Sequence, residues 1–167
     1  MTAINQSTPG AIRGLSILTT TLDWLQRVGV ALAPLALRVA LAIPFYYSGL
    51  TKWTGFLQLS PTAVFLFEEQ FKLHIFGGEY ALPAPALLAW LDGVGEIVLP
   101  ICLILGFATR LSALALLVMT AVIQLVVPDG WVSYHLPWAA MALSLLALGA
   151  GPISVDWVLA RVFGSRK

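Results

Sequence analysis

WLDGVGEIVLPICLILGFATRLSALALLVM, residues 90–119, is the stretch that decides the fold. It contains two apolar runs separated by Gly106-Phe107-Ala108-Thr109-Arg110, and its only charged residues are Asp92, Glu96 and Arg110. Thirty residues this apolar are too long for one buried core helix. They predict two membrane-spanning helices joined by a tight turn.

This pattern places Glu96 near the middle of the bilayer. A carboxyl group at that depth costs at least several kcal/mol unless it is neutral, paired or facing a polar cavity. Glu96 is therefore expected to face the protein interior and to have a partner on another helix.

The composition supports an integral membrane protein. The chain has 167 residues, of which 59% are hydrophobic and 10% are charged, and its mean hydropathy is +0.91. A net charge of +1 argues against nucleic acid as a partner, because phosphates need a basic surface. The single cysteine excludes an internal disulfide and a cysteine-pair redox centre. The predicted fold class is an all-α four-helix transmembrane bundle with short amphipathic helices at the membrane surface.

The chain divides into a tail, a bundle and two amphipathic segments. Residues 1–14 form a flexible tail, and leucines at helical spacing in 15–28 predict a helix lying on the membrane face, or alternatively packed on a soluble partner. The bundle occupies 30–152, and 153–167 form an amphipathic segment. The predicted spans are 30–53, 85–107, 111–127 and 135–149, with a long connection at 54–84 that holds a short helix at 61–72.

The basic residues predict the topology. With the amino terminus in the cytoplasm, that side of the membrane has six basic residues and only two acids. The basic residues are Arg13, Arg27, Arg110, Arg161, Arg166 and Lys167, and the acids are Asp23 and Asp156. This bias predicts that both termini are cytoplasmic and that 54–84 lies outside.

Two ion pairs are candidates in the bundle. Arg38 and Glu96 differ in predicted depth by roughly 7 to 8 Å, which an extended arginine can cover, although Arg38 can equally snorkel to the near surface. Lys52 and Asp92 form the second candidate pair, nearer the outside. Either these pairs only fix the helix register, or Glu96 lines a polar pocket or proton path that opens outward.

Two histidines complete the set of chemically interesting side chains. His135 starts the fourth span, and His74 lies in the connection on the same side, so the two form a weak candidate for a metal site. Nothing else supports that site, and an interfacial or capping role for His135 is favoured, so no metal is predicted. The chain offers no combination of nucleophile, base and orienting group, so catalysis by this chain alone is not expected.

Several segments resemble a known family. Arg38, FYYSGLTKW (45–53), GEIVLPICLILGFATRLSALALLVM (95–119), HLPW (135–138) and GAGPISVDWVL (149–159) resemble the DoxX family of small four-helix bacterial membrane proteins. The family pattern falls on Arg38, Ser48, Gly49, Lys52, Glu96, Gly106 and Arg110. LFEEQFKL (66–73) resembles the subgroup that is encoded with copper-stress metallophore peptides.

The resemblance implies a function as well as a fold. Family members are described as membrane subunits of quinol-oxidase, thiosulfate:quinone or redox-stress assemblies. The first hypothesis is therefore an accessory subunit in the bacterial inner membrane that binds a quinone, with an oxidoreductase or a peptide-maturation protein as partner. The alternatives are a small transporter or export helper, which could require a homo-oligomer, and a purely structural anchor.

Overall fold

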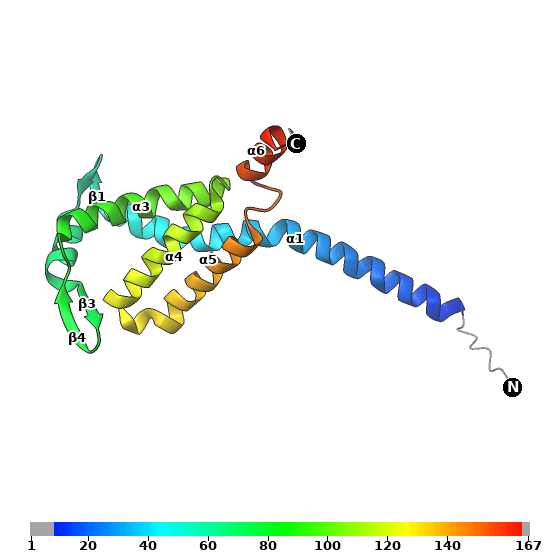
Figure 1. Cartoon of the computed structure of the whole chain (residues 1–167), viewed down its shortest axis with the longest axis horizontal. Helices are drawn as coiled ribbons and strands as arrows, with labels where there is room; N and C mark the ends of the chain where they lie inside the picture. The colour runs from blue at the N-terminus through cyan, green and yellow to red at the C-terminus, as the bar shows by residue number, and fades with distance from the viewer. Residues whose placement is uncertain (1–8, 165–167) are drawn as a thin grey trace.

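The computed structural model describes residues 9–164, with side chains from residue 19 onward. Within this described range, four helical segments are long and apolar enough to cross a membrane, and they confirm the predicted all-α membrane bundle (Figure 1). Most of the predicted tail, together with Arg166 and Lys167, lies outside the described residues.

The first helix differs from the prediction. The sequence predicts a surface helix at 15–28 and a separate span at 30–53, whereas the structure has one continuous helix, α1, over Pro9–Thr51. Gly29 does not break it, because an isolated glycine lowers helix stability by only about 1 kcal/mol. At 1.5 Å per residue, 43 residues extend about 65 Å, twice the thickness of the hydrocarbon layer. The first part of α1 accordingly projects beyond the bundle (Figure 1).

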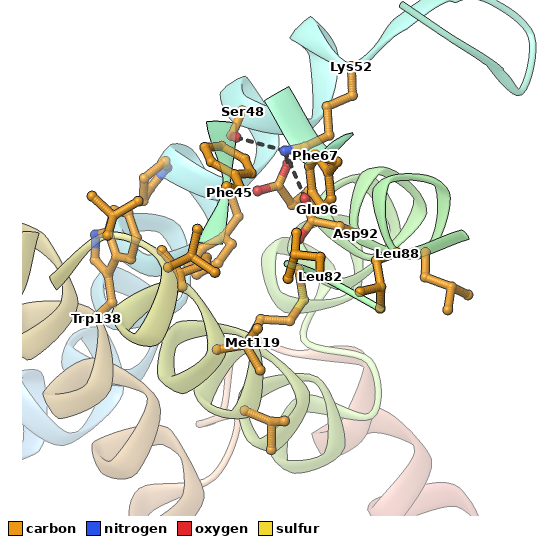
Figure 2. Close-up of a pocket in the computed structure, with 18 residues that line it drawn as sticks. Phe45, Ser48, Lys52, Phe67, Leu82, Leu88, Asp92, Glu96, Met119 and Trp138 are labelled. Atoms are coloured by element: carbon orange, nitrogen blue, oxygen red, sulfur yellow. Dashed lines mark hydrogen bonds and ion pairs between the residues drawn. The ribbon is translucent and has the colours of Figure 1, made fainter. Parts of the chain in front are cut away.

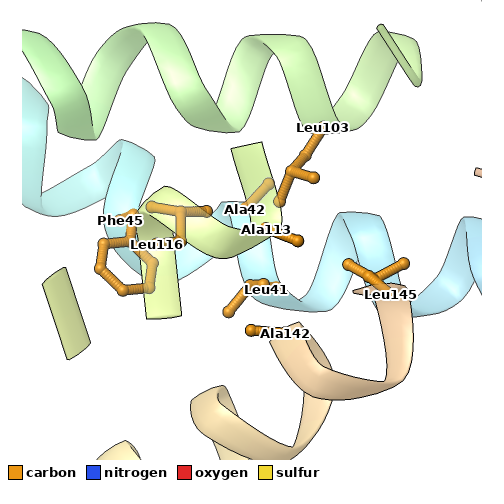
Figure 3. Packing of buried hydrophobic residues seen from close by; sticks show 8 residues of the cluster. All are labelled: Leu41, Ala42, Phe45, Leu103, Ala113, Leu116, Ala142 and Leu145. Carbon is orange, nitrogen blue, oxygen red and sulfur yellow. The ribbon is translucent and has the colours of Figure 1, made fainter. Parts of the chain in front are cut away.

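The bundle is a ring of four helices. The other three are α3 (Pro85–Leu105), α4 (Thr109–Val126) and α5 (Leu136–Leu148). Both α1 and α4 pack against α3 and α5. The core between them is formed by eight buried side chains, drawn in Figure 3: Leu41, Ala42, Phe45, Leu103, Ala113, Leu116, Ala142 and Leu145.

The turn between α3 and α4 makes these helices antiparallel neighbours, as the short hinge predicts. Gly106 has φ +68° and ends α3, and the amide of Phe107 donates to the carbonyl of Cys102 at 2.9 Å. Glycine favours this left-handed conformation, which satisfies carbonyls at the helix end.

The long connection has more regular structure than the sequence indicates. Its elements are β1 (Trp53–Gly55), β2 (Gln58–Leu59), α2 (Pro61–Phe65), the π-helical turn η1 (Leu66–Gln70), β3 (Lys72–Ile75) and β4 (Gly78–Ala81). The short helix lies where the sequence places it, whereas the hairpins β1–β2 and β3–β4 are additional. The connection covers one end of the bundle, and β3 packs against α4 (Figure 1).

The end of the chain lies at the opposite end of the bundle. After α4, a 3-10 turn η2 (Pro128–Gly130) and a π-helical turn η3 (Trp131–His135) lead into α5. The last helix, α6 (Val155–Phe163), begins at Ser154, whose hydroxyl accepts from the amide of Trp157 at 3.1 Å. In Figure 1, α6 lies near the turn between α3 and α4, far from the connection.

Candidate functional site

A cavity of about 380 Å³ lies in the half of the bundle beneath the connection. All four bundle helices line it, together with side chains of the connection (Figure 2). This volume is in the range of small-molecule sites. Its polar lining residues are Ser48 of α1, Lys52 directly after α1, and Asp92 and Glu96 of α3.

Lys52 is at the centre of the polar side chains. Its ammonium nitrogen lies 2.9 Å from Asp92 Oδ2 and 3.2 Å from Ser48 Oγ, and it also donates to Glu96 Oε2. Figure 2 shows these contacts converging on one nitrogen atom. We refer to Ser48, Lys52, Asp92 and Glu96 as the polar cluster.

Helical spacing and one glycine explain why the polar cluster forms. Asp92 and Glu96 are four residues apart on α3 and share a helix face, and Ser48 lies four residues before Lys52, which directly follows the last turn of α1. The two helices approach closely at Gly49, where an added Cβ would lie 3.0 Å from the backbone carbonyl carbon of Glu96. The absence of a side chain there brings the two faces together.

The charges of the polar cluster are largely removed from solvent. The side chains of Lys52 and Glu96 are 12% and 4% exposed. The Lys52 ammonium contacts the carboxyl groups of both Asp92 and Glu96. Lys52 is therefore held as a cation shared by two acids.

The rest of the cavity is apolar. Phe45 of α1 and Trp138 of α5 form one wall, with ring centroids 5.0 Å apart. Phe67, Phe71 and Leu82 of the connection cover the cavity, and the first two rings meet edge to face at 5.2 Å. The cavity thus has a charged end and large apolar walls, which suits an amphipathic molecule.

Arg38 does not belong to this site, and the predicted Arg38–Glu96 pair is wrong. The Arg38 side chain is fully buried at the other end of the bundle. Its guanidinium donates to the carbonyls of Leu103 and Ile104 at 3.3 and 3.4 Å and to that of Ile153. Carbonyls at a helix end have no partner within the helix, and Arg38 supplies donors to those at the end of α3.

A further contact at that end was not expected from the sequence. The two carboxylate oxygens of Asp156 accept from the amides of Ala108 and Thr109, each at 2.8 Å. These amides begin α4, where a negative charge is favourable. Asp156 thereby attaches α6 to the bundle.

The two histidines lie near the end of α4 that faces the connection. His135 is buried, and its Nδ1 is 2.6 Å from Gln124 Oε1. His74 Nδ1 is 3.1 Å from the carbonyl of Leu125, and its Nε2 is 3.7 Å from Glu79. Within residues 9–164, no three His, Cys, Asp or Glu side chains gather as metal ligands would. Neither histidine lines the cavity.

The structure thus brings together four of the six predicted site residues and leaves out Arg38 and His135. It also joins Lys52 to both acids, where the sequence pairs it with Asp92 alone. The spacing of Asp92 and Glu96 could have revealed this, because a cation facing one also faces the other. Of the residues that cover the cavity, Phe67 and Phe71 share one face of the short helix predicted at 61–72, but this spacing does not indicate what they cover.

Comparisons with known proteins agree with the fold. The model of the DoxX family matches residues 33–129, a range that includes the whole polar cluster and more than half of the chain. An uncharacterized protein of Haemophilus influenzae is 29% identical over 161 residues, covering 85% of this chain and 93% of that protein. No solved structure matches the chain. On this evidence, the chain is a membrane protein of the DoxX family.

Proposed function

We propose that this protein is an accessory membrane subunit of a redox or metal-stress system, and that it binds a quinone-type amphiphile in the cavity around Glu96. The observation that carries the proposal is the cavity itself, which joins a charged cluster to large aromatic and aliphatic walls. A quinone has this division, with polar oxygens on a ring and an apolar tail.

The cavity dimensions and the polar groups support binding over anchoring. A purely structural ion pair needs no empty volume beside it, and close-packed interiors contain few voids larger than a water molecule. Here about 380 Å³ lies against the polar cluster. Burying two carboxyl groups and one ammonium is energetically costly. Such groups beside an empty volume are expected where a site binds a ligand.

The chain supplies binding rather than a redox centre of its own. Its single cysteine, Cys102, cannot form an internal redox pair. Electron transfer would therefore depend on the bound molecule and on a partner protein. This dependence on a bound molecule and a partner protein is the reason for assigning an accessory role. We place that role in the cytoplasmic membrane of a bacterium.

The first experiment tests what the cavity holds. Protein purified from its native membrane in mild detergent is extracted with organic solvent and analysed for quinones by mass spectrometry. We expect a quinone in amounts close to one per chain in the wild type and a much smaller amount in Glu96→Gln. Ser144→Ala is the control, because Ser144 lies on α5 outside the cavity and its hydroxyl donates to the carbonyl of Ala140.

The second experiment tests the physiological role. A deletion strain complemented with Glu96→Gln should grow as poorly as the uncomplemented strain under copper or oxidative stress, whereas Ser144→Ala should restore growth. Full growth with Glu96→Gln would contradict the proposed function.

A further inference from the structure

We propose that the cavity receives its ligand from the hydrocarbon of the bilayer, through an opening between α3 and α4, and selects a head group that donates hydrogen bonds. This inference deepens the proposed function and rests on it for the location of the site. It concerns the route of entry and the chemical class of the ligand.

The route follows from which cavity residues also lie on the outer surface. Leu91 of α3 and Val118 and Val122 of α4 all line the cavity, and their exposed fractions are 52%, 57% and 48%. On a membrane bundle, apolar side chains exposed between two spans face lipid. The cavity therefore reaches the lipid-facing surface at this position.

The two helices diverge there. One helical turn from Leu91 toward Gly106, an added Cβ at Gly95 would lie 3.3 Å from Met119 Sδ, so α3 and α4 are in close contact there. Figure 1 shows them separating from the turn at Gly106 toward the connection. Phe67, Phe71 and Leu82 cover the end of the cavity that faces the connection. A ligand dissolved in the bilayer has the more direct path.

The preference for a donor follows from counting hydrogen bonds in the polar cluster. A lysine ammonium has three N–H donors and no acceptor. Those of Lys52 are directed at Ser48, Asp92 and Glu96, so all three are used. The Ser48 hydroxyl accepts from Lys52 and lies beside the carboxyl group of Glu96, to which its own proton can be donated.

The acceptors, in contrast, are not exhausted. Two carboxyl groups share one ammonium, and an ionised carboxylate accepts at about four positions. A ligand hydroxyl can therefore donate to Asp92 or Glu96, whereas a ligand carbonyl would have to displace an existing contact of Lys52. Among quinone-type molecules, this cluster favours the reduced, dihydroxy form.

The test uses a probe of defined chemistry. The full-length protein in phosphatidylcholine vesicles is titrated with ring-brominated 4-decylphenol, because bromine quenches tryptophan fluorescence on contact and Trp138 lines the cavity. The difference between wild type and Trp138→Phe isolates the signal of Trp138. We expect saturable quenching by the phenol and about tenfold weaker binding of its methyl ether, which has the same ring and chain but no donor.

The route is tested by narrowing the opening. Val118→Phe combined with Val122→Phe should slow phenol binding about tenfold, and Leu91→Phe on the opposite helix should act in the same direction. The matched control is Leu111→Phe with Leu114→Phe, which changes two exposed residues of α4 outside the cavity. Circular dichroism confirms that each variant is folded.

The outcomes separate this inference from the proposed function. Equal binding of the phenol and its ether overturns the donor preference, and unchanged rates in both narrowed variants overturn the lateral route. Either result can occur while Glu96→Gln still loses stress resistance, in which case the proposed function stands without this inference. Suppose instead that Glu96→Gln keeps normal stress resistance, while the phenol binds better than its ether and binds more slowly to the narrowed variants. This inference then stands and the proposed function is overturned.

Discussion

At the scale of single residues, the site depends on one cation shared by two acids. Removing one partner of a buried pair leaves an uncompensated charge, which costs more than the pair contributes when intact. Lys52 is the critical member, because both Asp92 and Glu96 rely on it. Arg38 differs at the other end of the bundle, where the two terminal nitrogens of a buried guanidinium donate to backbone carbonyls and its Nε has no hydrogen-bond partner.

Lys52→Met should therefore destabilise the folded protein by roughly 3 kcal/mol near pH 8. The measurement is denaturant unfolding in detergent micelles, with Lys72→Met as the control, because Lys72 donates to a backbone carbonyl of Glu68 in the connection. A loss for Lys52→Met no larger than that of the control would show that the shared cation does not hold α1 to α3.

At the scale of elements, close contacts and helix ends determine how the helices are joined. Gly49 permits the approach of α1 to α3 that forms the polar cluster, and Asp156 joins the start of α6 to the start of α4. Gly49 and Asp156 are single residues, and each one fixes where a neighbouring helix packs.

Gly49→Val should destabilise the protein by roughly 2 kcal/mol, because the new side chain would press on the backbone of α3 at Glu96. The control is Gly29→Val in the same helix, where a Cβ meets nothing within 4 Å and where we expect a change below about 0.5 kcal/mol. Thermal unfolding in detergent compares them. Equal effects of the two substitutions would show that the helices are not in close contact at Gly49.

Asp156→Asn should loosen α6. It weakens the two hydrogen bonds to the amides of Ala108 and Thr109, and loss of such a cap costs about 0.5–2 kcal/mol. Hydrogen exchange measured by mass spectrometry should become faster in 155–163 while the exchange of α3 stays unchanged. Asp129→Asn, which alters an exposed carboxylate near α5, serves as the control. Unchanged exchange in 155–163 would rule out Asp156 as the attachment of α6.

At the scale of the whole molecule, four spans place α6 and the connection at opposite ends of the bundle, as Figure 1 shows. The distribution of basic residues predicts which end faces the cytoplasm. The long first helix extends the molecule on the side of α6, and the cavity lies toward the connection.

We expect both termini to be cytoplasmic. A carboxy-terminal green fluorescent protein should fluoresce and a carboxy-terminal alkaline phosphatase should be inactive, whereas phosphatase inserted at Gly77, in the turn between β3 and β4, should be active. The two reporters act as each other's control for expression. An active phosphatase at the carboxy terminus would reverse the topology and place the connection in the cytoplasm.

The sequence by itself determined the membrane bundle and its four spans, because apolar run length and hydrophobicity are local properties of the chain. It also supplied Ser48, Lys52 and Asp92 as members of the site. Only the tertiary structure decided that Lys52, and not Arg38, is the partner of Glu96. That choice depends on how α1 is rotated and how closely it approaches α3 at Gly49, and similarity in depth does not fix either. The continuity of α1 and the cover over the cavity were likewise decided by packing between segments distant in the chain, which local patterns do not encode.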